Sequence, residues 1–176
     1  MKKLIIAAVA LCTALVAQAA TVSWSATNIA KSGDSTAYYA MLIDASSTEL
    51  TKASDVAEAI IAGKFDGTAL WDGAATYSAS KSVVAVAAAK KPLAGYDSGS
   101  VSYYTIIFDA TDVTKATNYL VTSGDTAATG MISDAGALTI SQGSQDGKTW
   151  TAVPEPTSGL LLLLGMAGLA LKRKIA

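Results

Sequence analysis

The sequence of 176 residues predicts a mainly β protein, an antiparallel β-sandwich or barrel with one packed helix. Short runs of alternating, β-branched or aromatic residues recur along the middle of the chain, separated by Gly, Asp and Ser. Only one stretch there has clear helical spacing. Hydrophobic stretches at the two ends predict, in addition, an N-terminal signal helix and a C-terminal transmembrane helix. The alternative fold class is α+β, if residues 75–89 form a helix.

The first strand is predicted where Val22, Trp24 and Ala26 alternate with hydroxyl-bearing residues, a pattern typical of a half-buried strand. A second strand is predicted at residues 37–44, and residues 101–109 (VSYYTIIFD) are the clearest strand of the chain. Shorter strands are predicted at residues 119–122, 137–141 and 149–153.

The one helix is predicted at residues 55–63 (DVAEAIIAG). Asp55, with Glu58 three residues later, resembles a capping box, and Gly63 is a typical helix end. Its predicted apolar face consists of Val56, Ala59 and Ile60.

Residues 75–89 (ATYSASKSVVAVAAA) are ambiguous, because their alanines favour a helix and their valines and alternating serines favour a strand. We predict a strand here. Residues 90–92 and 95–99 are then predicted to be loop. Asp146-Gly147 predicts a hairpin turn between the last two strands.

The composition of residues 20–153 excludes several classes of chemistry. This region holds eight lysines and thirteen acidic residues, a net charge of −5, which disfavours nucleic acid as a partner. The chain has no histidine, its one arginine is Arg173 near the C-terminus, and its one cysteine is Cys12 near the N-terminus. Histidine-dependent triads, histidine metal sites and thiol chemistry are therefore excluded from the middle region.

Paired carboxylates remain as candidates for a glycosidase. The acidic candidates are Asp44, Glu49, Glu58, Asp109 and Asp112. We favour the interpretation that they are turn and cap residues. No calcium-loop pattern occurs, and we predict no catalytic residues, no metal and no cofactor, so that the protein is not an enzyme.

Two segments of the middle region show local similarities. Residues 144–150 (SQDGKTW) resemble the Asp-box hairpin of sialidases and β-propeller proteins, but the motif is one residue short and occurs once. We interpret it as a turn with Trp150 packing beneath it. Residues 38–45 are also similar to residues 103–110, which indicates either a duplicated unit or two core strands of convergent composition. Both are expected to be central strands, with Asp44 and Asp109 opening the turns that follow.

The N-terminal 19 residues have the three parts of a secretory signal peptide. Lysines follow the initial Met, residues 4–16 are apolar, and Ala17-Gln18-Ala19 is a small-x-small cleavage site. Cleavage by signal peptidase is expected after Ala19, which makes Ala20 the mature N-terminus.

The C-terminus has three features in order. Pro154-Glu155-Pro156 cannot join a helix interior or a central strand. Residues 159–171 are uncharged and apolar, about 20 Å long as a helix, which makes them a marginal membrane anchor. Lys172, Arg173 and Lys174 follow, and positive charge favours the cytoplasmic side. The middle domain is therefore expected on the outer side of the membrane.

This arrangement resembles the PEP-CTERM sorting signal of Gram-negative bacteria. The matching residues are Val153, Pro154, Glu155, Pro156 and Thr157, the leucine-rich run and the basic cluster. The resemblance implies recognition by an exosortase, a membrane protease. It also implies a transient stay in the inner membrane through the C-terminal helix, then delivery to the cell surface or an extracellular matrix. The expected organisation is a signal peptide (1–19), a secreted β-rich domain (20–152) and the sorting signal (153–176).

The first functional hypothesis is an exported structural or adhesive surface protein, associated with extracellular polysaccharide. The alternatives are a carboxylate-dependent glycosidase or carbohydrate-binding module, and a simple C-terminally anchored membrane protein.

Overall fold

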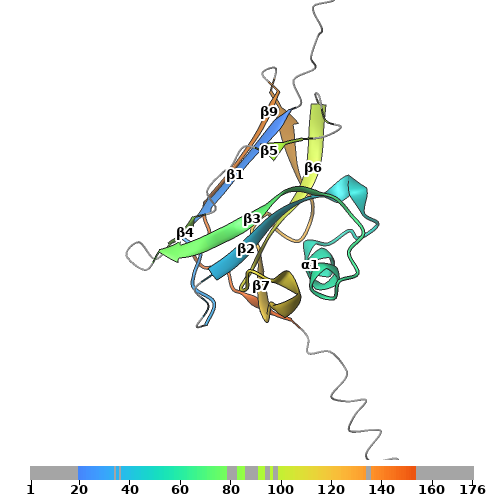
Figure 1. The fold of residues 1–176 in the computed structure, drawn as a ribbon. Helices are drawn as coiled ribbons and strands as arrows, with labels where there is room; N and C mark the ends of the chain where they lie inside the picture. The colour runs from blue at the N-terminus through green and yellow to red at the C-terminus, as the bar shows by residue number, and fades with distance from the viewer. Residues whose placement is uncertain are drawn as a thin grey trace, which may run out of the picture.

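A ten-stranded sheet, curled into a nearly closed barrel, forms the body of the protein (Figure 1). The computed structural model describes residues 20–33, 35, 37–78, 83–85, 91–93, 96, 99–133 and 136–153. The predicted signal peptide, the Pro-Glu-Pro triplet, the hydrophobic run and the basic cluster lie outside the described residues. The prediction of a mainly β fold with one packed α-helix is confirmed for the described part of the chain.

The strands and helices follow one another through the whole domain. The strands are β1 (Thr21–Thr27), β2 (Ala37–Asp44), β3 (Ala69–Ser78), β4 (Val83–Ala85), β5 (Lys91–Pro92), β6 (Gly99–Phe108), β7 (Asn118–Val121), β8 (Ala128–Ile132), β9 (Ala137–Ser144) and β10 (Thr151–Ala152). The helices are α1 (Ala53–Ile61) and two 3₁₀ turns, η1 (Ala45–Ser47) and η2 (Val113–Lys115). In the described residues, no helix is long and apolar enough to cross a membrane.

The order of strands across the sheet is β4-β3-β2-β6-β8-β9-β1-β5, with β7 beside β6 and β10 beside β7. All pairs are antiparallel except β1 and β9, which run parallel over the full length of β1. The predicted antiparallel architecture therefore holds for the other strand pairs, and this parallel pair was not predicted. Parallel neighbours need a long connection, and here nearly the whole domain lies between the two strands.

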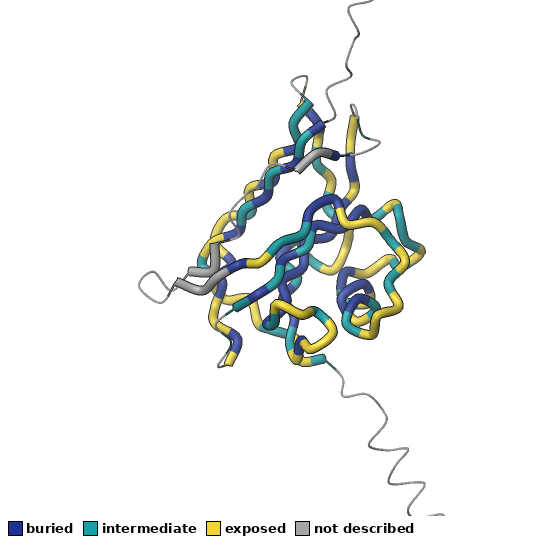
Figure 2. The backbone as a smooth tube through the Cα atoms, in the orientation of Figure 1, coloured by how far each residue is buried: buried dark blue, intermediate teal, exposed yellow. Residues whose placement is uncertain are grey.

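The interior of the barrel is apolar, and Figure 2 marks the buried strand segments in dark blue. Val22, Trp24 and Ala26 are fully buried, which confirms the predicted inward face of the first strand. Trp24 meets Trp71 of β3 edge to face, with ring centroids 5.5 Å apart. This contact joins strands near opposite ends of the sheet order and holds the curled ends together.

From Tyr103 to Phe108, strand β6 is buried on both faces, which explains why this part of its sequence is mostly apolar without alternation. Tyr103 and Ile107 face the barrel interior. Tyr104, Ile106 and Phe108 face outwards and are covered by a second cluster that includes α1. Strands β2 and β6 are antiparallel neighbours in the middle of the sheet, so the two similar segments are central strands, as predicted.

The two similar segments do not continue alike. Asp44 caps η1 directly after β2, whereas Asp112, not Asp109, caps η2 after β6. A Thr-Lys-Ala triplet follows each segment, at residues 51–53 and 114–116, but the two differ in structure, because Ala53 begins α1 and Ala116 follows η2. The likeness therefore holds for the strands and not for the turns after them.

Helix α1 begins at Ala53, two residues before the predicted start, and the predicted capping box is wrong. Asp125, in the loop after β7, caps the helix instead: its carboxylate accepts from Ser54 N at 2.8 Å and its carbonyl from Ala53 N at 2.9 Å. A tertiary contact thus replaces the local cap. The predicted end is confirmed, because Gly63 has φ +64° and follows the last helical turn.

Four other predictions are corrected by the sheet. The ambiguous region 75–89 contains the end of β3 and all of β4, which pair as an antiparallel hairpin rather than forming one strand. Lys91–Pro92, predicted as loop, is β5 and pairs with β1; proline is tolerated there because β5 lies at the edge of the sheet. Strand β8 (ATGMI) was not predicted, since its short pattern contains a glycine. The predicted last hairpin is wrong, because β10 pairs with β7 and not with β9.

The sheet forks at Thr105, where β6 leaves β8 and begins to pair with β7. Side chains fill the fork. The Thr105 hydroxyl accepts from Gln142 Nε2 at 2.7 Å and from the Thr122 hydroxyl at 2.8 Å. Trp24 Nε1 donates to the side-chain oxygen Oε1 of Gln142 at 3.3 Å. Hydrogen-bonded side chains therefore connect β9 to β6 where no backbone ladder does so.

Candidate functional site

The C-terminal exit of the domain positions the predicted sorting motif. Strand β10 pairs with β7 in the register Thr151 to Tyr119 and Ala152 to Asn118. Val153 N then donates to Thr117 O at 2.9 Å, and the half-buried Val153 packs against the cluster beneath α1. In Figure 1, β7 lies beside α1 at the lower edge of the domain. Val153, the first residue of the predicted motif, is therefore part of the folded domain.

Trp150 fixes the chain immediately before β10. Its ring stacks on Tyr38 with centroids 5.4 Å apart, and its Nε1 donates to Ala30 O at 2.7 Å. The Asp146-Gly147 turn does exist, because Lys148 N donates to Gln145 O at 3.1 Å and Gly147 has φ +80°. It redirects the chain between distant parts of the sheet, and Trp150 packs against Tyr38 at the start of β2.

Asp109 holds the start of β7, to which β10 is bound. Its carboxylate is buried and accepts from Thr117 N at 2.9 Å, from the Thr117 hydroxyl at 2.8 Å and from Asn118 Nδ2 at 2.8 Å. Burial opposes ionisation, but these hydrogen bonds outweigh it and lower the pKa of Asp109. Asp109 lies directly after β6, where the chain turns, as predicted. The sequence pattern did not indicate its partners, which lie eight and nine residues further along the chain.

Asp44 and Asp112 are also turn residues. Buried Asp44 accepts from Ser46 N at 2.8 Å and from the Ser46 hydroxyl at 2.7 Å, and it also binds the Tyr96 hydroxyl. Asp112 accepts from Thr114 N at 3.2 Å and forms an exposed ion pair with Lys115. The interpretation of these carboxylates as cap and turn residues is confirmed.

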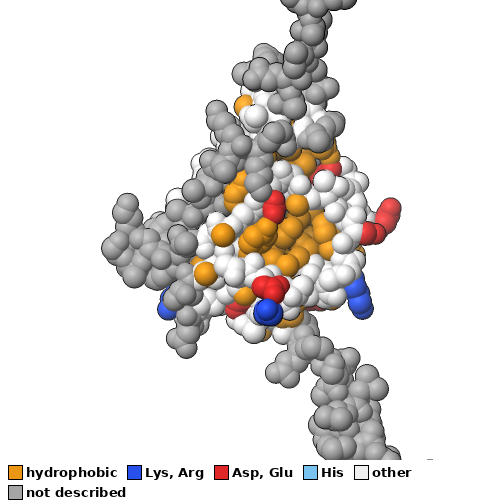
Figure 3. Space-filling view, in the orientation of Figure 1, with side chains coloured by type: hydrophobic (Ala, Val, Ile, Leu, Met, Phe, Trp, Pro, Cys, Tyr) orange, Lys and Arg blue, Asp and Glu red, His pale blue; other side chains and the backbone are white. Residues whose placement is uncertain are grey.

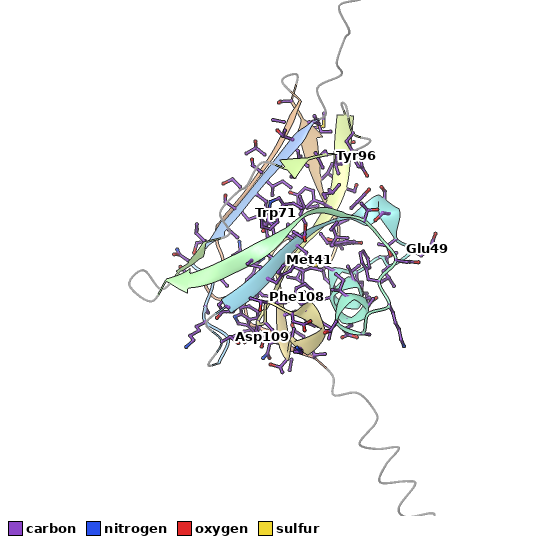
Figure 4. The ribbon with its side chains drawn as sticks, viewed as in Figure 1. Met41, Glu49, Trp71, Tyr96, Phe108 and Asp109 are labelled. Atoms are coloured by element: carbon purple, nitrogen blue, oxygen red, sulfur yellow. The ribbon has the colours of Figure 1, made fainter. Side chains whose placement is uncertain are left out.

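Asp44 and Asp109, the candidates at the ends of the two similar strands, do not come together in the fold. The register pairs Asp44 with Tyr103 and Tyr39 with Phe108, so Asp44 and Asp109 lie at opposite ends of the β2–β6 pair. At about 3.4 Å per residue they are separated by roughly 20 Å, whereas paired glycosidase carboxylates lie about 5–10 Å apart. Figure 4 shows Glu49 and Asp109 on different sides of the domain. Within the described residues, no cluster of three or more metal-ligating side chains occurs.

The aromatic side chains do not form an exposed sugar-stacking platform in the part of the chain whose burial is described. Among those residues the one exposed large hydrophobic side chain is Met131, at 68% exposure. Hydrophobic side chains do gather on the face that Figure 3 presents. In the same region Met41 is half-buried, whereas Phe108 is completely buried and lies beneath the surface.

Residues 152–174 match the family model described as the PEP-CTERM protein-sorting motif. No curated protein and no solved structure matches the chain. The match leaves the barrel domain without a recognised family, and it begins at Ala152, inside strand β10. The C-terminal tail thus carries a PEP-CTERM sorting motif, which indicates an exported protein sorted by an exosortase.

Proposed function

We propose that this protein is a cell-surface or extracellular-matrix protein made as a membrane-anchored precursor. Signal peptidase removes residues 1–19, with Ala17 and Ala19 at the cleavage site and Ala20 as the new N-terminus. Residues 159–171 hold the precursor in the inner membrane, with Lys172, Arg173 and Lys174 on the cytoplasmic side. An exosortase then cuts at the tail and releases the barrel domain outwards. The observation that carries this proposal is the sorting-motif match at residues 152–174.

The test is the mass of the mature protein in a host that has an exosortase. We expect a product that begins at Ala20 and lacks residues 160–174. A surface product that retains these residues supports the alternative of a simple C-terminally anchored protein. Removing Pro154, Glu155 and Pro156 is expected to leave the precursor in the inner membrane, and unchanged delivery to the surface would count against exosortase sorting.

We propose that the barrel domain has a structural or adhesive role and is not an enzyme. The turn and cap roles of Asp44, Asp109 and Asp112, and the wide separation of Asp44 from Asp109, support this proposal over a paired-carboxylate glycosidase. Incubation with the host's own polysaccharide tests it: release of reducing ends by the purified protein would support the glycosidase.

For the polysaccharide association, the surface that we propose is the outer face of β1 and β9. Here the parallel register places Ser23 beside Thr139 and Ser25 beside Ser141, while the alternate residues point into the barrel. The Ser23 hydroxyl donates to the Thr139 hydroxyl at 3.4 Å at an exposed position. These uncharged hydroxyls both donate and accept, which suits the hydroxyls of a neutral polysaccharide.

Binding to this surface is measured by affinity electrophoresis in gels that contain the host's polysaccharide. The polysaccharide is expected to slow the migration of the wild-type protein but not that of the variant Ser25→Glu/Ser141→Glu. Binding of polysaccharide to the variant would bury two carboxylates that have no partner, which is costly. The control is Thr129→Glu, at an exposed position of β8. If the polysaccharide slows the wild type, the double variant and the control equally, the outer face of β1 and β9 is not the binding surface.

A further inference from the structure

The sorting segment and the folded domain share residues. The family match begins at Ala152, which belongs to β10, and Val153 continues the pairing with β7 through its bond to Thr117 O. Pro154 follows at once. Since a protease binds its substrate as an extended strand over several residues, the residues just before Pro154 are needed by the domain and by the enzyme at the same time.

Strand β10 is weakly held. It consists of two exposed residues, and its one partner among the described strands is β7, so that it lies at an edge of the sheet. The half-buried Val153 is the apolar contact at its end. An exposed edge segment with so little buried apolar surface opens locally at small cost, without unfolding the rest of the domain.

The segment that opens has a defined upstream limit. Trp150 is stacked on Tyr38 and bonded to Ala30 O, so it stays with the domain when β10 leaves. Freeing residues 151–153 adds roughly 10 Å of extended chain between the domain and Pro154, at about 3.4 Å per residue. With this extra length, the segment around Pro154 can enter a membrane protease while the barrel stays clear of the enzyme's surface.

We propose that β10 is a releasable latch: it is paired with β7 in the mature and resting domain, and it detaches to enter the exosortase. This inference rests on the proposed processing of the tail. It makes the folded domain a brake on its own processing, because cleavage is limited to molecules in which β10 has opened.

A disulfide across β7 and β10 tests the latch. Because Val153 N donates to Thr117 O, Val153 and Thr117 occupy a hydrogen-bonded pair position of the antiparallel ladder. Ala152 and Asn118, one step along, are then the non-hydrogen-bonded pair, in which side chains lie closest. Residues 20–176 contain no cysteine, so an Asn118→Cys/Ala152→Cys pair has no competing thiol in the mature chain.

The full-length variants are expressed in the exosortase host. The rate of processing is measured from the decrease in protein mass as the C-terminal tail is removed. With the disulfide formed, we expect processing to slow by at least about tenfold, because local opening is then blocked. Reduction is expected to restore the rate. Asn118→Cys and Ala152→Cys alone are the matched controls, since each removes a native side chain without the crosslink.

A bypass variant separates the latch from any damage to the motif. It carries the crosslink and, between Val153 and Pro154, a short Gly/Ser linker followed by a second Ala-Val pair. The linker supplies the length of extended chain that the crosslinked β10 can no longer provide. Rapid processing of this variant with its disulfide intact therefore supports the latch. If the crosslinked protein is processed at the wild-type rate, or if the linker gives no recovery, the latch is refuted. If the wild-type tail is never removed, the proposed sorting function fails instead.

Discussion

The fork of the sheet at Thr105 gives the sharpest test of what holds the barrel together. Thr105 is completely buried, and its hydroxyl is the shared acceptor for Gln142 and Thr122. The variant Thr105→Val removes this one oxygen and keeps the branched shape of the side chain. The donors of Gln142 and Thr122 then lose their acceptor in the interior.

The expected cost is about 2 kcal/mol of unfolding free energy, because a buried donor left without a partner costs about 1–3 kcal/mol. Gln142 is half-buried and Thr122 keeps a 3.4 Å contact to the Thr105 carbonyl, so the cost stays below that of two orphaned donors. The double variant Thr105→Val/Thr122→Val is expected to lose less than the sum of the single changes, since it removes donor and acceptor together.

The assay is urea unfolding of the domain without its two hydrophobic ends, followed by tryptophan fluorescence. A loss of 2 kcal/mol lowers the midpoint by about 1 M at a slope of about 2 kcal/mol/M. The matched control is Thr139→Val, the same chemical change at an exposed position of β9, with an expected effect within about 0.5 kcal/mol. If Thr105→Val costs no more than Thr139→Val, the side-chain network does not hold the fork and the reasoning is refuted.

Three further changes are expected to act through named contacts. Asp109→Asn should destabilise the domain by about 2 kcal/mol at neutral pH, because the amide cannot accept all the donors of the charged carboxylate. Folding lowers the pKa of Asp109, so the extra unfolding free energy of the wild type is fully present above the ordinary aspartate pKa of about 4. It is lost as the pH falls through the lower pKa of the folded state. The urea unfolding curves of the two proteins should therefore converge in acid. Asp125→Ala should cost about 1 kcal/mol by uncapping α1, with protection of the Ser54 amide from hydrogen exchange falling first; an unchanged exchange rate would contradict the capping role. Trp24→Ala should cost about 3–5 kcal/mol in the same urea assay by opening a cavity beside Trp71, and a loss below 1 kcal/mol would show that the barrel interior is not packed around this pair.

The interior of the fold was largely predictable from local pattern. The alternation in β1 and the apolar run of β6 identify core strands, because side-chain burial has the same period as the strand. Which strands become neighbours was not predictable. The parallel pairing of β1 with β9 and the transfer of β10 to β7 depend on contacts between residues far apart in the chain.

Residue type and order alone identified the sorting motif at the C-terminus and the kinds of chemistry that residues 20–153 lack. They also indicated that one strand ends at Asp44 and another just before Asp109. The folded structure was needed to show that Asp125 caps α1, that Gln142 bridges the fork of the sheet, and that the sorting match begins inside a paired strand. The physical reason is that a hydrogen bond between distant segments forms only after the intervening chain has folded, and no local pattern records its partner.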